Sequence, residues 1–99
     1  MQTTPGPSAE FVIAGGGTAG CVLAARLSEA GHSVLVLEAG GTHDRFFVNM
    51  PLGYGKLFHD DSLNWSYTTA PDAQLGGRTD YWPRGKLLGG SSAINAMVY

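Results

Sequence analysis

Two apolar runs, separated by an amphipathic segment, dominate the first forty residues. Residues 11–14 (FVIA) and 34–37 (VLVL) are continuously apolar, and the second run is typical of a parallel strand covered on both faces. Between them, apolar residues recur every three or four positions up to about Ala30, which predicts a helix with its charged positions facing water. Gly31 follows as a natural helix C-cap. The pattern therefore predicts a strand–helix–strand unit over residues 11–38.

The pattern is less regular after Glu38. Residues 39–64 are rich in Gly, Asp, Asn and Pro and show no sustained period, so they predict a long excursion with one short helical turn near residues 53–58. An irregular segment of this length is usually functional or packs against something else. Its aromatic residues are too many for a free linker, and we expect them to bury against a part of the protein outside this chain: Phe46, Phe47, Tyr54 and Phe58.

Short strands are predicted in the next segment. Residues 65–69 alternate large and small side chains, which indicates a strand. Residues 78–82 predict a returning strand that Pro83 ends, with turn signals at 71–72 and 76–77 between the two.

The glycines at residues 15–20 (GGGTAG) carry the first candidate chemistry. Gly15 allows a sharp turn out of the strand, Gly17 lets a diphosphate approach the backbone, and Gly20 allows the helix to pack closely on the strands. The helix that begins here offers unpaired N–H groups and a positive dipole end to an anion. The motif, in this strand–helix context, predicts a dinucleotide-binding βαβ unit.

Glu38 supports the same interpretation, because it ends the second strand, 18 residues after Gly20. A carboxylate at this position can accept hydrogen bonds from adenosine ribose hydroxyls. The alternative is that the glycines only form a tight turn and that Glu38 is a solvated acid at a strand end.

A second glycine cluster lies at residues 84–95 (RGKLLGGSSAIN). Ser91 and Ser92 are good N-cap residues for a helix running into Ala93 and beyond. This junction could present N–H groups to an anion, or it could be an ordinary capped helix with surface cations.

Composition limits the other classes of function. The chain has 99 residues, enough for at most one domain, and a formal charge of −2, which gives no basic excess for nucleic acid or an anionic membrane. The single cysteine, Cys21, cannot form an internal disulfide and is expected to fill a small position in the first helix. His43 and His59 lack metal-ligand spacing. We expect a disordered lead-in at residues 1–10, no targeting signal, no membrane span and a cytoplasmic location.

The two glycine clusters, in this order and spacing, resemble the N-terminal part of the glucose–methanol–choline (GMC) family of flavoprotein oxidoreductases. The motifs that carry the resemblance are GGGTAG at 15–20, EAGG at 38–41, NWSY at 64–67 and PRGKLLGGSSAIN at 83–95. The last is similar to the family's first signature and is the most specific of the four. Among family members, the pattern most resembles the choline-dehydrogenase-like, alcohol-oxidising branch.

The resemblance implies FAD as the cofactor. It assigns to the diphosphate Gly15, Gly17, Thr18, Ala19 and Gly20. It assigns Glu38 to the adenosine ribose with Ala39 beside it, and Trp65 to a position close to the cofactor. Along the diphosphate, ribityl chain and flavin ring it implies Gly89, Gly90, Asn95, Ala96, Met97 and Val98, with Leu88 nearby. Members that bind flavin covalently have a histidine where this chain has Ile94, so non-covalent FAD is expected.

The implied reaction is oxidation of an alcohol to a carbonyl by hydride transfer to the flavin. The family's catalytic histidine lies in a C-terminal part that these residues do not match, so no catalytic residue and no metal ligand is assigned. Because the chain ends within an apolar segment and supplies two parallel strands, we expect an incomplete α/β fold. Residues 11–99 would be the N-terminal part of a larger, doubly wound, Rossmann-like FAD domain, with the remainder of the enzyme as partner.

Three alternatives stay open from sequence. An NAD-binding dehydrogenase segment would use the same βαβ unit but leaves the second glycine cluster unexplained, and Glu38 disfavours NADP. A hydroxynitrile lyase of the same family would bind FAD without net redox chemistry. A non-catalytic FAD-binding segment is the third alternative.

Overall fold

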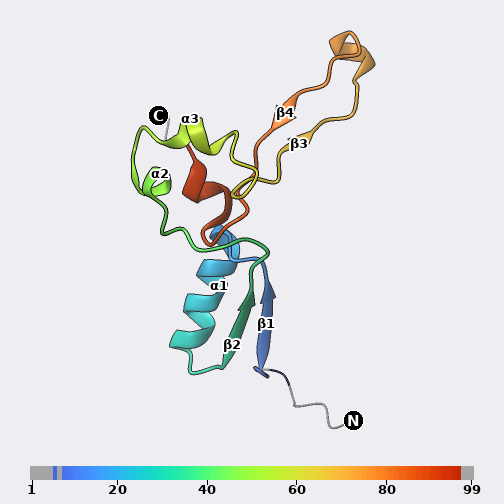
Figure 1. Cartoon of the computed structure of the whole chain (residues 1–99). Coiled ribbons are helices and arrows are strands. Elements are labelled where there is room, and N and C mark those ends of the chain that lie inside the picture. The colour runs from blue at the N-terminus through green and yellow to red at the C-terminus, as the bar shows by residue number, and fades with distance from the viewer. Residues whose placement is uncertain (1–5, 7, 97–99) are drawn as a thin grey trace, which may run out of the picture.

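The computed structural model of the chain describes residue 6 and residues 8–96. The strands β1 (Phe11–Ala14) and β2 (Val34–Leu37) pair in parallel, from Phe11 opposite Val34 to Ala14 opposite Leu37. Helix α1 (Thr18–Glu29) connects them and lies along the two-stranded sheet (Figure 1). The predicted strand–helix–strand order is therefore confirmed, within one or two residues at each boundary.

Helix α1 ends as its sequence predicts. Gly31 adopts a left-handed φ of +89° and its N–H donates to the Ser28 carbonyl, 3.0 Å away, so it terminates the helix without steric strain. On the outer face, Arg26 and Glu29 form an exposed ion pair at 2.9 Å.

The apolar surface of this unit is only partly covered. Val22 and Leu23 on α1 are 57% and 53% exposed, and Val12 on β1 is 58% exposed. The expectation that residues 34–37 are covered on both faces is wrong for the described residues, since none of them is fully buried and Leu37 is 54% exposed, because one helix covers a two-stranded sheet on one side. The radius of gyration, 17.3 Å, agrees with this open shape, since a compact domain of this length has about 13 Å.

The buried core lies beside the glycine loops instead. Leu57, Leu63, Leu87 and Ile94 pack together, and Val48, Phe58 and Ala93 lie against them. The core thus joins the excursion to the second glycine cluster.

The excursion contains two short helices, α2 (Phe46–Asn49) and α3 (Tyr54–Leu57). The second was predicted as a helical turn, whereas α2 was not predicted. Phe46 remains 72% exposed in this chain. That these aromatics bury against another part of the protein stays a prediction.

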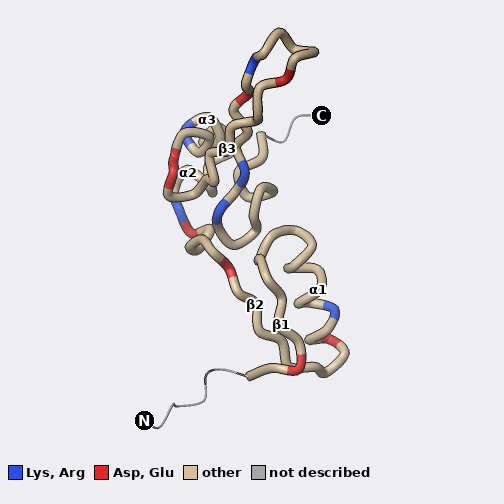
Figure 2. The backbone as a smooth tube through the Cα atoms, turned by 90° about the vertical axis from the view of Figure 1, so that its right-hand side faces the viewer, with Lys and Arg blue, Asp and Glu red and all other residues tan. Residues whose placement is uncertain are grey.

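Residues 65–83 form a hairpin that projects from the body of the chain in both views (Figures 1 and 2). Its strands β3 (Tyr67–Thr68) and β4 (Tyr81–Trp82) are antiparallel and shorter than predicted. A 3-10 helix, η1 (Ala73–Leu75), forms the tip.

The second glycine cluster folds differently from expectation. Residues Gly90–Ile94 form a 3-10 helix, η2, and Asn95 is already extended. The predicted serine caps are wrong, because Gly89 is the N-cap and no side chain caps this helix. The serines have other partners: Ser91 Oγ accepts the Gly85 N–H at 3.1 Å, and Ser92 Oγ donates to the Gly89 carbonyl at 2.7 Å.

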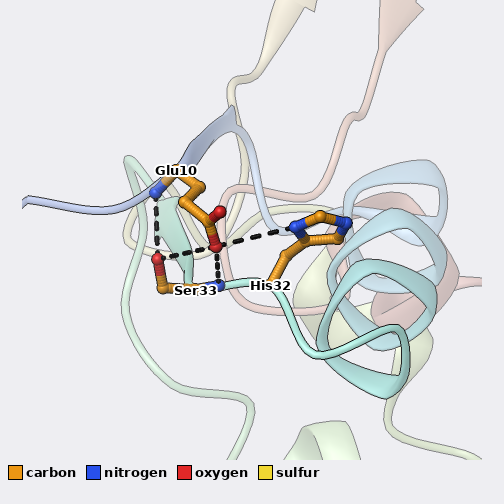
Figure 3. A network of polar contacts seen from close by, with 3 residues as sticks. All are labelled: Glu10, His32 and Ser33. Atoms are coloured by element: carbon orange, nitrogen blue, oxygen red, sulfur yellow. Dashed lines mark hydrogen bonds and ion pairs between the residues drawn. The ribbon is translucent and has the colours of Figure 1, made fainter.

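A small polar network fastens the start of the sheet (Figure 3). The Glu10 carboxylate accepts the Ser33 N–H at 2.9 Å, and the Glu10 N–H donates to Ser33 Oγ at 3.0 Å. His32 Nδ1 lies 3.6 Å from the same carboxylate. Glu10, assigned from sequence to the disordered lead-in, thus ties the entry of β1 to the entry of β2. These hydrogen bonds, the Ser33 N–H first among them, hold the pKa of Glu10 below its ordinary value of 4.5.

The Glu10 network predicts a pH-dependent stability. A carboxyl group with a lowered folded-state pKa stabilises the fold above its unfolded pKa, and this contribution disappears as pH falls through the lower folded value. The variant Glu10→Gln should therefore unfold at a slightly lower temperature than wild type at pH 7. The difference should shrink as pH falls below about 4.3, the unfolded-state pKa, and vanish once pH is below the folded-state pKa. Thermal unfolding measured from pH 3 to 7 tests this. The variant Glu29→Gln, which breaks an exposed pair, is the control. A difference for Glu10→Gln that persists unchanged at pH 3 would contradict the assignment.

Candidate functional site

The two glycine-rich loops, more than seventy residues apart in sequence, contact each other directly. The Gly89 N–H donates to the Gly16 carbonyl at 2.7 Å. A Cβ built on Gly90 would lie 2.9 Å from the Cα of Gly17, so the two backbones meet without room for a side chain. Thr18 Oγ1 donates to Ser92 Oγ at 3.1 Å and adds a side-chain link. The loops therefore form one continuous backbone surface.

Glycine is required at several positions of this surface, either by a positive φ or by a close backbone approach. Gly15 and Gly89 have φ of +96° and +97°, a conformation that L side chains rarely adopt. A Cβ on Gly20 would overlap the Gly15 carbonyl, so Gly20 allows the close approach of α1 to the turn, as predicted.

The N-terminus of α1 is open at the centre of this surface. Gly17 is extended and no side chain caps the helix. The N–H groups of the first turn, at Thr18 and Ala19, therefore have no partner within the helix. A Cβ on Gly17 would meet only the Gly90 Cα at 3.9 Å, which is ordinary contact. The helix offers N–H donors and a positive dipole end to an anion here.

Glu38 is fastened to this surface by two backbone hydrogen bonds. Its Oε2 accepts the Gly16 N–H at 2.6 Å and its Oε1 accepts the Gly40 N–H at 2.9 Å. The side chain is half-buried, and each carboxylate oxygen keeps further capacity to accept a hydrogen bond. The position of Glu38, 18 residues after Gly20, does not by itself predict these two hydrogen bonds. Glu38 consequently shapes the glycine loop in addition to presenting a carboxylate.

A cavity of about 460 Å³, which we name the Glu38 cavity, opens beside this carboxylate at the carboxyl ends of β1 and β2. Six of the sequence-predicted residues line it: Gly15, Gly17, Glu38, Ala39, Trp65 and Gly90. Gly85 and Ser91 also line it and were missed, although both belong to the motif at 83–95. Ligands of open α/β sheets commonly bind at this edge.

A second cavity, of about 830 Å³, lies on the other side of η2, and we name it the Leu88 cavity. Four further predicted residues line it: Leu88, Gly89, Asn95 and Ala96. Side chains of the excursion complete a mainly apolar wall, including Phe47, Val48, Met50, Tyr54 and Leu57. Consecutive residues of one short segment therefore face two adjoining cavities.

The remaining predicted residues lie close by or outside the described part. Thr18 and Ala19 are in the exposed first turn of α1, and Gly20 is buried beneath it. Met97 and Val98 lie outside the described residues. Cys21, expected to fill a small packed position, is instead exposed, lines the Leu88 cavity and donates to the Gly16 carbonyl at 3.2 Å. On α1, Cys21 faces the second glycine loop. The spacing of apolar residues along the sequence does not predict this direction.

The histidines occupy separate environments. His43 lines the Leu88 cavity, and His59 stacks on the Tyr81 ring at 5.9 Å. Within residue 6 and residues 8–96, no three His, Cys, Asp or Glu side chains gather as a metal site would require. Over the same residues, no helix is long and apolar enough to cross a membrane.

The donors and acceptors of the site fit an elongated ligand with a phosphate-bearing middle. Backbone N–H groups and a helix N-terminus lie at the junction of the two cavities, where side chains are excluded by paired glycines. A carboxylate suited to hydroxyl groups lies in the smaller cavity, and apolar walls line the larger one.

The comparisons with known proteins agree on one family. A family model described as GMC oxidoreductase matches residues 9–99. An oxygen-dependent choline dehydrogenase from Vibrio vulnificus and an alcohol dehydrogenase (acceptor) from Pseudomonas putida are each 50% identical over 91 residues. These alignments cover 91% of this chain and 16% of each relative, so the chain spans about a sixth of their length.

Solved structures agree with these relatives. Pyridoxine 4-oxidase from Mesorbium loti superimposes with a TM-score of 0.83 at 43% identity, covering 93% of this chain and 18% of that protein. A fungal aryl-alcohol oxidase gives a TM-score of 0.68 at 33% identity, over 90% of this chain and 15% of that protein.

The contact between the glycine loops predicts a sensitive position. The variant Gly90→Ala should destabilise the protein by about 2 kcal/mol, because the new methyl group overlaps Gly17 and the residue has a φ of +59°. The variant Gly55→Ala, in α3, is the control, since a Cβ there has no neighbour within 4 Å. Chemical denaturation of both variants measures the difference. Equal stability of the two would show that the loops are not in contact.

Proposed function

The chain belongs to the GMC oxidoreductase family, and from this premise we propose that it holds FAD for the oxidation of an alcohol to a carbonyl compound. Residues 11–99 would form the N-terminal part of a Rossmann-like, doubly wound FAD-binding domain, and the rest of the enzyme would complete it. The observation that carries the proposal is the direct contact of the two glycine loops between two cavities, one of which is lined by the Glu38 carboxylate.

The residues divide between the parts of the cofactor by their chemistry. Glu38, Ala39 and Trp65 would hold the adenosine end, since they line the cavity with the carboxylate. The diphosphate would meet backbone groups at the junction of the cavities, from Gly15, Gly17, Thr18, Ala19, Gly20, Gly89 and Gly90. The flavin would lie toward the mainly apolar Leu88 cavity, along Leu88, Asn95 and Ala96, with Met97 and Val98 continuing this segment.

The chain's own contribution to the reaction is binding and orientation. FAD supplies the hydride acceptor when it is bound. The two glycine loops fix the position of the cofactor's middle, because their backbones are joined by a hydrogen bond and cannot separate without losing it. The apolar residues of the excursion would give the flavin an apolar wall in the larger cavity.

Proton transfer from the alcohol belongs to a residue outside this chain in our proposal. His32 contacts Glu10 before β1, at the end of the sheet away from the cavities, and His59 stacks on Tyr81. His43 lines the Leu88 cavity but does not match the family's catalytic motif. Ile94, where a flavin-linking histidine would stand, is an apolar side chain 3% exposed in the core. We therefore propose that FAD is bound non-covalently, since the Ile94 side chain offers no nucleophile.

Flavin binding is tested on the full natural gene product. We expect a yellow protein with an absorption maximum at about 450 nm that loses its colour when an alcohol is added without oxygen. Candidate alcohols are those in the names of the relatives: choline, pyridoxine and aryl alcohols. A protein that carries a nicotinamide cofactor instead would contradict the proposal. If flavin is bound but no alcohol reduces it, the proposed FAD binding stands and the proposed alcohol oxidation is contradicted.

Glu38 variants test the adenosine end. The change Glu38→Ala removes the hydrogen bonds to Gly16 and Gly40 and those expected to ribose, each worth about 1–3 kcal/mol when charge-assisted, so FAD affinity should fall at least tenfold. The change Glu38→Gln keeps one acceptor oxygen and should have an intermediate effect. Titration of FAD into the cofactor-free protein measures both, and Glu29→Ala on the outer face of α1 is the control. If FAD affinity is undiminished in Glu38→Ala, Glu38 does not hold the adenosine end of the cofactor.

A further inference from the structure

Ser66 has an unusual backbone conformation next to a residue of the Glu38 cavity. Among the non-glycine residues that the structure describes, it alone has a positive φ, of +52°. The β-carbon disfavours this left-handed region, so a serine stays there only when its surroundings impose it. The preceding residue, Trp65, lines the Glu38 cavity. A strained conformation beside a cavity points to a functional constraint on this turn.

Hydrogen bonds to the excursion hold Ser66 in this conformation. The Ser66 hydroxyl donates to Asp61 Oδ1 at 2.6 Å, and the Ser66 N–H donates to Asn64 Oδ1 at 3.0 Å. The Tyr81 hydroxyl, from the opposite strand of the hairpin, donates to Ser66 Oγ at 3.2 Å. The side chain and the backbone of Ser66 are therefore both fixed, and they attach the start of the hairpin to the excursion.

Burial alone does not fix the Trp65 side chain. Trp65 is 42% exposed, and its ring stacks on that of Tyr67, with the ring centres 6.0 Å apart and the planes 8° from parallel. Ser66 lies between these two residues, so its backbone conformation sets how the two rings meet. The Trp65 N–H donates to the Arg84 carbonyl at 2.8 Å, which holds the backbone on the other side of the ring. The direction of the Trp65 ring therefore depends on Ser66.

We propose that Ser66 is a positioning residue, which directs Trp65 toward the adenosine end of a nucleotide cofactor in the Glu38 cavity. Asp61 is the acceptor that keeps Ser66 left-handed. Without this hydrogen bond the backbone relaxes toward an unstrained φ, and the Trp65 ring loses its position in the cavity wall. This inference rests on the proposed function, in which the cavity holds the adenosine end of FAD.

Titration of FAD into the cofactor-free full gene product tests the role of the hydroxyl. The change Ser66→Ala should weaken FAD binding about threefold to tenfold, as the loss of one ordinary hydrogen bond would. The change Asp61→Ala should have the same effect. The change Asp61→Asn keeps an acceptor oxygen for the Ser66 hydroxyl and should restore the affinity.

Ser62→Ala is the matched control. The Ser62 hydroxyl donates to Asp60 Oδ1 at the same distance, 2.6 Å, in the same exposed segment. Neither Ser62 nor an adjacent residue lines the Glu38 cavity or the Leu88 cavity. This substitution should leave FAD affinity unchanged.

A double-mutant cycle with Trp65→Ala separates positioning from general support of the fold. If Ser66 acts through the Trp65 ring, Ser66→Ala should weaken FAD binding no further once Trp65→Ala is present. If Ser66 only supports the fold, the two losses should add.

Three results would each overturn the inference: unchanged FAD affinity in Ser66→Ala, additive losses with Trp65→Ala, or a loss in Asp61→Asn as large as in Asp61→Ala. The proposed function stands in each of these cases, because the wild-type protein still binds FAD. Failure of the wild-type protein to bind FAD would overturn the proposed function and the inference together.

Discussion

The hydrogen bond between the Gly89 N–H and the Gly16 carbonyl organises the rest of this chain. It brings the turn that follows β1 against the loop that precedes η2, and thereby sets the boundary between the two cavities. The bond can form only because glycines on both sides let the backbones approach within contact distance. The site is therefore made mainly from main-chain atoms, whose positions depend on fold rather than on side-chain rotamers.

A single buried amide supports this arrangement from the other side. Asn64 Oδ1 accepts the N–H groups of Arg84 and Ser66, at 2.8 and 3.0 Å, and its Nδ2 donates to the Phe58 carbonyl at 3.0 Å. Asn64 is 3% exposed, so these bonds are shielded from water and costly to lose. One side chain thus joins the excursion, the hairpin and the segment that leads to the second glycine loop.

The sequence specifies the strand–helix–strand unit well, because the period of its apolar residues and the fingerprint of residues 15–20 describe the same structure. Through motif resemblance, the sequence also predicts Gly90, Ala39 and Trp65 as site residues. In the structure these three residues line one cavity. The remainder depends on tertiary contacts that have no local signal. The helix α2 has no signal in the sequence, and the serines before Ala93 bond to Gly85 and Gly89 rather than capping a helix. The network of Asn64 is likewise invisible, since asparagine in an irregular segment predicts a turn.

The pairing of Gly17 with Gly90 has a consequence for how such sites can be recognised by evolution-based methods. Contacts are usually inferred when a change at one position is compensated by a change at another. Two glycines that touch through their backbones have no smaller residue to exchange, so neither position can compensate for the other. A side chain at Gly90 would overlap Gly17, whereas one at Gly17 would make only ordinary contact, so the contact would leave an invariant Gly90 instead of covariation. This junction is therefore one that coevolutionary statistics are poorly able to detect.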